Sequence, residues 1–269
     1  MSETSTRTRL CAVPLFLGLV ACALACSPAL GRGRAIAPKL QHRTDTGPGF
    51  GAGTGGPSGL PAPEYAPASI YARLDRETCL AELTRRNVPF VATAPVTGVI
   101  APVRLTGPVQ GIRIHGVEPE KKRVTSPFEV FDCRLVLALD DFAGVLARHD
   151  VVEIVHMSAY RPPPKNWPAT KPGSRHGGAL ALDMGSFVKR DGTQLRVERD
   201  FHGRVGAKTC GVDASPYPPS TEATELRDIV CEASDRRLFN VALTPNYNRA
   251  HRDHFHMEVT AGVSWFLVR

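Results

Sequence analysis

The pattern of apolar and polar positions divides the chain into three parts. Residues 10–25 form an apolar run that is shorter than the ~20 residues of a comfortable bilayer span. Residues 27–68 are dominated by Gly, Pro, Ser and Ala, without a periodic apolar pattern that could build a core. From residue 69 onward, apolar positions recur at the spacings of helices and strands. We therefore expect a flexible tether at 27–68 and one folded domain at 69–269.

Three segments of this domain carry a helical pattern. Residues 70–86 place apolar side chains near a helical period, and Asn87 and Pro89 end the segment. Residues 128–149 repeat large apolar side chains at helical spacing, so this helix should cover a sheet. Residues 222–233 also favour a helix.

The strand signals lie between these helices. Residues 91–109 are broken at short intervals by prolines and glycines, which favours short β segments. Residues 151–160 are β-branched and apolar, as in a central strand, and residues 178–184 and 255–259 have a similar character. Together the patterns predict an α+β domain in which helices cover a small antiparallel sheet.

The N-terminal segment has the features of an export signal. Arg7 and Arg9 precede the apolar run, which suits a signal peptide at 1–26. Within it, Leu19-Val20-Ala21-Cys22 resembles the lipobox at which bacterial lipoproteins are cleaved and acylated, so Cys22 is the candidate lipid anchor. The alternative is a plain secretory signal cleaved near the same place. Either signal predicts an exported protein of the periplasm or cell envelope.

Cysteine usage agrees with export. Four cysteines follow the signal, namely Cys79, Cys133, Cys210 and Cys231. An even number suits disulfides in an oxidising compartment, and the four cysteines allow three connectivities. Closure of nearest neighbours favours Cys79 with Cys133 and Cys210 with Cys231. The two-to-four-residue spacing of zinc-finger ligands is absent.

Composition narrows the choice of partners. The chain is 42% hydrophobic and 22% charged, as in ordinary soluble domains. Its formal net charge is +7, but no run of Lys or Arg interleaves with aromatic residues, which argues against nucleic acid as a partner. We expect a monomer that touches the membrane only through its lipid anchor.

One expected strand carries a carboxylate beside small residues. Alternation along Gly178–Met184 places Ala179, Ala181 and Asp183 on one face, while the larger apolar residues pack inward on the other. His176 lies just where the strand begins. Metal ligation would explain this arrangement, although a surface aspartate with a loop histidine would explain the segment equally well.

A second segment concentrates histidines. Three of the nine histidines lie within residues 251–256. In an extended strand, His254, His256 and Glu258 share one face, while Phe255 and its alternate neighbours share the other. Two imidazoles and one carboxylate would leave Zn²⁺ an open fourth position, which is typical of a catalytic site.

The motifs resemble those of a known family. Residues 174–183 resemble the SxHxxGxAxD signature of zinc D-alanyl-D-alanine peptidases, and residues 253–256 are similar to their [E/D]xxH motif. With Ser158-Ala159-Tyr160-Arg161, similar to the SxYR segment, they resemble the bacterial extensin-like C-terminal domain over roughly residues 79–258. The resemblance implies the fold of the lysostaphin, D-Ala-D-Ala peptidase and hedgehog group. Ala179 departs from it, because the signature has glycine there.

The resemblance also implies residue roles. His176, Asp183 and His256 become Zn²⁺ ligands, and Asp253 becomes the general base. Arg161 would contact the substrate carboxylate or the developing oxyanion. The further substrate-binding candidates are Tyr160, in the SxYR-like segment, and Ser174, which would also orient the His176 loop.

The assignment of the base has an internal alternative. Residues 253 and 256 differ by three, so a straight strand would point Asp253 and His256 to opposite faces. Asp253 must therefore lie on a bend before the strand. If it does not, His254 is the natural acid or base. We assign Asp253 as base and His254 as an accessory catalytic residue.

The expected function is a zinc-dependent peptidase, either a carboxypeptidase or an endopeptidase, acting on peptidoglycan peptides. The alternative is a non-catalytic, zinc-containing lipoprotein that binds the cell wall. A retained acidic residue at the base position favours the enzyme.

Overall fold

The computed structural model describes residues 62–269. The expected signal peptide, its Cys22 and almost all of the tether lie outside this range, so those predictions remain untested. Within the described part of the chain, no helix combines the length and the apolarity that a bilayer crossing requires.

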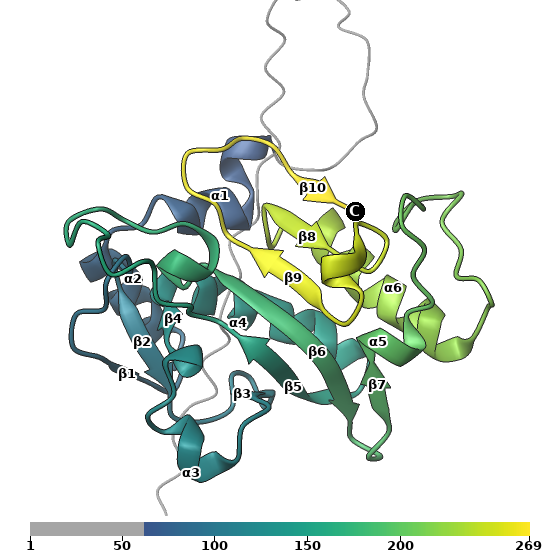
Figure 1. Cartoon of the computed structure of the whole chain (residues 1–269), viewed down its shortest axis with the longest axis horizontal. Coiled ribbons are helices and arrows are strands. Elements are labelled where there is room, and N and C mark those ends of the chain that lie inside the picture. Colours follow the sequence, from purple (N-terminus) through teal and green to yellow (C-terminus); the bar gives the residue numbers. More distant parts are fainter. Residues whose placement is uncertain (1–61) are drawn as a thin grey trace, which may run out of the picture. The chain divides into compact units, whose positions relative to one another are not determined.

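The helices surround two sheets (Figure 1). The α-helices are α1 (Pro67–Ala72), α2 (Arg76–Arg85), α3 (Glu120–Arg123), α4 (Cys133–Arg148), α5 (Val197–Asp200) and α6 (Thr221–Asp235). Short 3₁₀ turns are η1 (Pro63–Tyr65), η2 (Pro127–Glu129), η3 (Arg175–Gly178) and η4 (Arg249–His251). The helix expected at 222–233 is confirmed as α6.

The larger sheet has seven strands in the described residues, in the order β10-β8-β9-β6-β5-β3, with β7 also paired to β6. Its strands are β3 (Arg113–Gly116), β5 (Val151–Ser158), β6 (Ala181–Lys189), β7 (Gln194–Arg196), β8 (Val241–Leu243), β9 (Phe255–Glu258) and β10 (Leu267–Val268). The α+β prediction is therefore correct, and the strand expected at 151–160 is confirmed as β5, which lies between β6 and β3.

The expectation of an antiparallel sheet is confirmed for most strand pairs of this sheet but not for all of them. The β3–β5 and β10–β8 pairs are parallel, whereas the other pairs of this sheet are antiparallel. A parallel pair needs a long crossover connection, usually a helix, and α4 lies in the chain between β3 and β5. The result is a mixed sheet.

A smaller sheet has the order β1-β2-β4 and is antiparallel. Its strands are β1 (Phe90–Ala92), β2 (Pro102–Leu105) and β4 (Phe131–Asp132). The first two confirm the short β segments expected within 91–109.

The segment expected as one helix at 70–86 is two helices. Asp75 adopts extended backbone geometry and its carboxylate accepts a hydrogen bond from Thr78 N at 2.8 Å. This N-cap starts a new helix and interrupts the periodic pattern. Asn87 does end the second helix, in the left-handed region with a φ of 57°.

The helix expected at 128–149 begins later, at Cys133. Asp132 Oδ1 accepts from Arg134 N at 3.0 Å and from Arg134 Nε at 2.7 Å, so a buried side chain caps α4 and pairs with a buried cation. Phe131, expected in the helix, lies in β4 instead. The cap sets the boundary because it satisfies orphan amides of the first turn.

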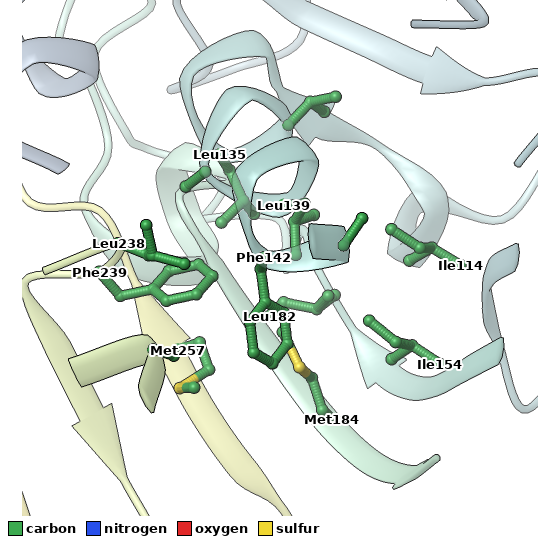
Figure 2. Packing of buried hydrophobic residues seen from close by; sticks show 14 of the residues in the cluster. Ile114, Leu135, Leu139, Phe142, Ile154, Leu182, Met184, Leu238, Phe239 and Met257 are labelled. Atoms are coloured by element: carbon green, nitrogen blue, oxygen red, sulfur yellow. The ribbon is translucent and has the colours of Figure 1, made fainter. Parts of the chain in front are cut away.

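The main core lies between α4 and one face of the larger sheet (Figure 2). Phe142 of α4 and Phe239 meet edge to face with 5.6 Å between ring centroids. Leu182 and Met184 of β6 and Met257 of β9 pack in the same cluster. The inward face predicted for β6 and β9 is thus confirmed, and the alternate side chains of both strands point away from this core.

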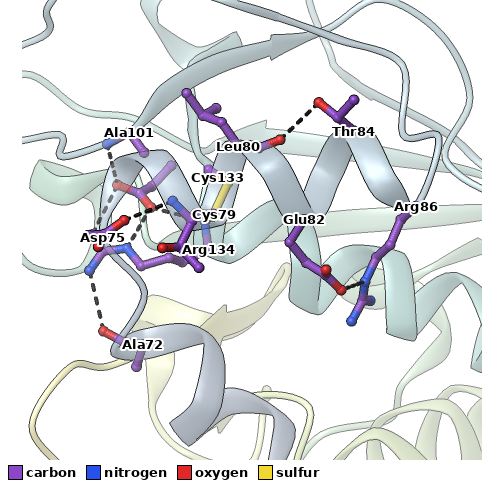
Figure 3. The surroundings of a disulfide bond; sticks show 12 residues. Ala72, Asp75, Cys79, Leu80, Glu82, Thr84, Arg86, Ala101, Cys133 and Arg134 are labelled. Carbon is purple, nitrogen blue, oxygen red and sulfur yellow. Dashed lines mark hydrogen bonds and ion pairs between the residues drawn. A yellow bond between two sulfur atoms is a disulfide. The ribbon is translucent and has the colours of Figure 1, made fainter.

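Both predicted disulfides are present. Cys79 of α2 is bonded to Cys133 at the start of α4 (Figure 3), with 6.0 Å between their Cα atoms. Cys210 is bonded to Cys231 of α6, with a Cα separation of 5.5 Å. The first bond ties the N-terminal helices to the helix that covers the sheet.

Candidate metal centre

The centre is built on two neighbouring strands. Asp183 of β6 and His256 of β9 are direct partners in the antiparallel register. Side chains in such a pair project to the same face with their Cβ atoms about 5 Å apart. Because Leu182 and Met257 occupy the core face, Asp183 and His256 both face away from the core.

His176 completes the group from the 3₁₀ turn η3. Its Nε2 lies 3.1 Å from Asp183 Oδ1 and 3.2 Å from His256 Nδ1. His256 Nδ1 lies 2.9 Å from Asp183 Oδ1. Among the described residues, these three form the group of potential ligands whose donor atoms all lie within 4.8 Å of one another. The three residues predicted as ligands are therefore brought together.

The outer nitrogens of both histidines have acceptors. His176 Nδ1 lies 2.8 Å from Ala159 O, and His256 Nε2 lies 3.2 Å from Glu258 Oε2. Hydrogen bonds of this kind fix the tautomer of a metal-ligating imidazole. In the tautomers whose outer nitrogens carry the proton, the lone pairs of His176 Nε2 and His256 Nδ1 face the carboxylate of Asp183. Three electron-rich atoms at such distances repel one another unless a cation or protons lie between them.

The donor set fits zinc. Two imidazole nitrogens and one carboxylate oxygen are the ligands of many catalytic zinc sites, which keep a further position open. Asp183 is only 1% exposed. Burial alone would raise the pKa of the Asp183 carboxyl, but hydrogen bonds with His176 and His256 outweigh it and hold that pKa well below its usual value. The centre thus holds a buried anion at neutral pH, which favours a bound cation.

Glycines allow the His176 turn to pack closely. A Cβ at Gly173 would lie 2.2 Å from Gly177 O, and a Cβ at Gly178 would lie 2.4 Å from Gly173 O. Gly173 N also donates to Gly98 O at 2.7 Å. The backbone of η3 therefore packs against the segments at Gly173 and Gly98 more closely than residues with a side chain would allow.

The backbone conformation of Ala179 explains why the signature has glycine at this position. It ends η3 with a φ of 53°, in the left-handed region. Glycine adopts this conformation readily, whereas alanine does so at a cost of about 1 kcal/mol. The residue tolerates the position because its small side chain is buried beside Tyr160 and Val130.

Asp253 and His254 form a pair next to the ligands. Asp253 lies in a turn before β9, as the resemblance required. Its Oδ1 is 2.8 Å from His254 Nδ1, and His254 Nε2 is 3.4 Å from Asp183 Oδ1. The carboxylate predicted as base therefore contacts His254, and the imidazole faces the ligand group.

Arg161 also reaches the centre. It donates from Nη2 to Asp183 Oδ2 and from Nε to Ser158 Oγ at 2.9 Å. Ser158 Oγ in turn donates to Asp183 Oδ2 at 3.3 Å. The Arg161 side chain remains 54% exposed, so its guanidinium lies between the ligand carboxylate and solvent.

The two other predicted substrate contacts lie in different surroundings. Tyr160 is buried, its hydroxyl donates to Thr97 O at 3.0 Å, and burial raises its pKa. Ser174 is exposed, and its carbonyl accepts from Gly178 N at 3.2 Å. Ser174 thus supports the His176 turn through its backbone. Their roles toward a substrate stay predictions.

Two residues near the centre, Glu258 and His251, were not among the predicted ligands or catalytic residues. Glu258 holds the outer nitrogen of His256, which the same-face alternation of β9 could have indicated. The His251 ring lies 5.2 Å from that of His254 and 5.8 Å from that of His256, measured between centroids. Burial, together with His254 and His256, lowers the pKa of His251 to about 4. The His251 imidazole is therefore uncharged at neutral pH and lies beside His254 and His256.

Comparisons place the chain in a family. Searches for similar curated proteins and for similar solved structures found no match. The family model described as extensin-like protein C-terminus matches residues 77–267. This range contains the four bonded cysteines and the whole candidate centre. The chain therefore belongs to the extensin-like protein C-terminus family.

Proposed function

We propose that this protein is an exported, zinc-dependent peptidase that hydrolyses peptide bonds of peptidoglycan. The observation that carries the proposal is the convergence of His176 Nε2, Asp183 Oδ1 and His256 Nδ1, together with acceptors on the outer nitrogens of both histidines. Such outer contacts are typical of metal-ligating histidines.

The residues that would hold Zn²⁺ are His176, Asp183 and His256. When bound, zinc supplies a Lewis acid that polarises a carbonyl and lowers the pKa of water. Glu258 keeps His256 in the tautomer that presents Nδ1, and the main chain at Ala159 does the same for His176 Nε2. The peptidase proposal is supported further by the resemblance of both motifs to those of D-alanyl-D-alanine peptidases.

Asp253 and His254 supply the group that accepts a proton from water. We assign the base to Asp253, with His254 accessory. The contact between Asp253 Oδ1 and His254 Nδ1 also permits the reverse, in which Asp253 holds the Nδ1 proton and His254 Nε2 is the acceptor.

Arg161 supplies positive charge beside the reacting centre. Its half-exposed guanidinium has donors left over after its bonds to Asp183 and Ser158. These donors can bind an oxyanion or a substrate carboxylate. The alternative function is a wall-binding lipoprotein without activity, but the acidic residue at the position of Asp253 and the free donors of Arg161 favour the enzyme.

Incubation of the zinc-loaded mature protein with purified muropeptides tests the proposal. A peptidase produces fragments whose masses identify the bond cleaved, and so separate carboxypeptidase from endopeptidase. A binder retains muropeptides on the immobilised protein and leaves their masses unchanged. Retention without products would replace the enzyme by the binding function.

A further inference from the structure

We propose that a second cavity, built from elements outside the metal centre, binds a small amphipathic ligand through its oxyanion, a carboxylate or a phosphate. The cavity has a volume of about 490 Å³ and lies between β1, β2, β3 and α3. Its basic side chains come from Arg104, Arg113 and Arg123. This inference is independent of the proposed peptidase activity.

Arg104 is held in place without a neutralising partner. Its Nη2 donates to Ser126 O at 2.8 Å and its Nη1 to Arg123 O at 3.3 Å. The side chain is partly buried, and no carboxylate of the described residues forms an ion pair with it. Main-chain carbonyls therefore fix the guanidinium while its positive charge remains available.

Arg123 is held in a similar way. Its Nη1 lies 2.6 Å from His115 Nδ1 and donates to Gly116 O at 3.4 Å. His115 Nδ1 also lies 2.9 Å from Gly116 O, and His115 Nε2 lies 3.1 Å from Glu153 Oε1. Glu153 also pairs with Arg113. The carboxylate of Glu153 thus contacts Arg113 and His115. Arg123 forms no ion pair in the described residues.

Two other partly or fully buried arginines of this fold have carboxylate partners, whereas Arg227 lies over the Phe201 ring and forms no ion pair in the described residues. Arg86 pairs with Glu82, Asp140 and Asp141. Arg134 pairs with Asp132. Arg104 and Arg123 are partly buried and have neither a carboxylate ion pair nor an aromatic ring beneath them in the described residues. Their free donors beside one cavity are suited to bind an anionic ligand.

Two carboxylates, Glu120 and Glu129, also line the cavity. Glu129 Oε1 accepts from Gly116 N at 2.6 Å, and its Oε2 lies 3.4 Å from His156 Nε2, so this group is already engaged. Glu120 is exposed in the first turn of α3. Glu129 attracts Arg123 electrostatically without an ion pair between them, whereas Arg104 forms no ion pair in the described residues and is the stronger candidate to bind an anion.

The walls define the rest of the ligand. Val91, at 50% exposed, and Val124, at 70% exposed, line the same cavity, and Leu105 extends this apolar surface. Small-molecule sites are typically apolar cavities of about 300–1,000 Å³ with a few fixed polar groups. Arginine forks match the planar oxygens of carboxylates and phosphates. The cavity therefore suits a ring-sized apolar group that carries one oxyanion.

Titration of the mature protein with phenyl phosphate, benzoate and benzyl alcohol, followed by amide chemical shifts, tests this site. The two anions should bind and shift residues of β2, β3 and α3, while the neutral alcohol should bind at least about tenfold more weakly. Arg104→Gln and Arg123→Gln should each weaken anion binding by about tenfold or more, because each removes charge-assisted hydrogen bonds. Arg175→Gln, an exposed arginine beside the metal centre, is the matched control and should leave binding unchanged.

A substitution that leaves both arginines in place tests the cavity even if the arginine variants fail to fold. Val124→Trp adds a bulky side chain at an exposed lining position and should block all three ligands while the melting temperature is retained. Benzyl alcohol binding as tightly as the two anions would overturn the proposal, since it would reveal an apolar cavity only. Anion binding that survives Arg104→Gln, Arg123→Gln and Val124→Trp would also overturn it.

Discussion

Asp253 and His254 are neighbours in sequence and partners in space, with 2.8 Å between Asp253 Oδ1 and His254 Nδ1. This contact directs His254 Nε2 toward Asp183, whose Oδ1 lies 3.4 Å away. A turn before β9 makes the contact possible, because it frees Asp253 from the alternation of the strand. The two candidate bases therefore act as one hydrogen-bonded pair.

Replacement of each member of this pair separates their roles. Asp253→Asn should retain zinc, because the amide is nearly isosteric and the three ligands are untouched. Loss of the base should lower kcat on a muropeptide by about 10²- to 10⁴-fold. His254→Ala should lower it less if His254 is accessory. Near-wild-type turnover in Asp253→Asn, with turnover lost in His254→Ala, would assign the base to His254 instead.

The three ligands should be required for metal binding. The purified domain should contain close to one zinc per chain, and His176→Ala or His256→Ala should abolish binding, since two remaining protein ligands rarely hold zinc tightly. Metal content by mass spectrometry checks this. His149→Ala, at the C-terminal end of α4, is the control and should retain the metal. Full zinc occupancy in both ligand variants would exclude the site.

Two neighbouring glycines provide a geometric test of the His176 turn. A Cβ at Gly173 would meet the backbone at 2.2 Å, so Gly173→Ala should displace η3 and weaken zinc binding. A Cβ at Gly177 would meet nothing within 4 Å. Gly177→Ala should therefore bind zinc as the wild type does. Equal zinc affinities of the two variants, measured by competition with a chromogenic chelator, would contradict this account of the turn.

Local alternation predicted much of the centre. Leu182 and Met184 face the core because period-two patterning fixes the face of a strand, and the same rule placed His254, His256 and Glu258 together. The strand faces depend on residues close in sequence, so they can be predicted without knowledge of the fold, and the disulfide pairs followed from the order of the cysteines along the chain.

Other features depend on contacts between distant segments. The outer partner of His176 is the carbonyl of Ala159, whose position is set by the end of β5, and no residue pattern indicates a carbonyl. Parallel pairing of β3 with β5 depends on the crossover through α4. The sequence could have indicated the side-chain cap at Asp75, but the apolar period across residues 70–86 favoured a single helix.

Asp132 should contribute strongly to stability. Its buried carboxylate caps α4 and pairs with buried Arg134. Asp132→Ala should lower the free energy of unfolding by about 3–5 kcal/mol, since it leaves the Arg134 charge buried and unpaired. Asp132→Asn keeps a capping oxygen and should lose less. Urea unfolding of the three proteins checks the order, and a loss below about 1 kcal/mol in Asp132→Ala would show that the pair is unimportant.

The central claim is that the His176, Asp183 and His256 group serves peptide hydrolysis. The most direct test is digestion of muropeptides in water labelled with heavy oxygen, followed by mass analysis of the products. Zinc-loaded wild type should give fragments whose new carboxyl group carries one labelled oxygen, and His256→Ala and chelator-treated protein should give none. Intact muropeptides with the zinc-loaded wild type, or labelled fragments formed equally fast by His256→Ala, would contradict the claim.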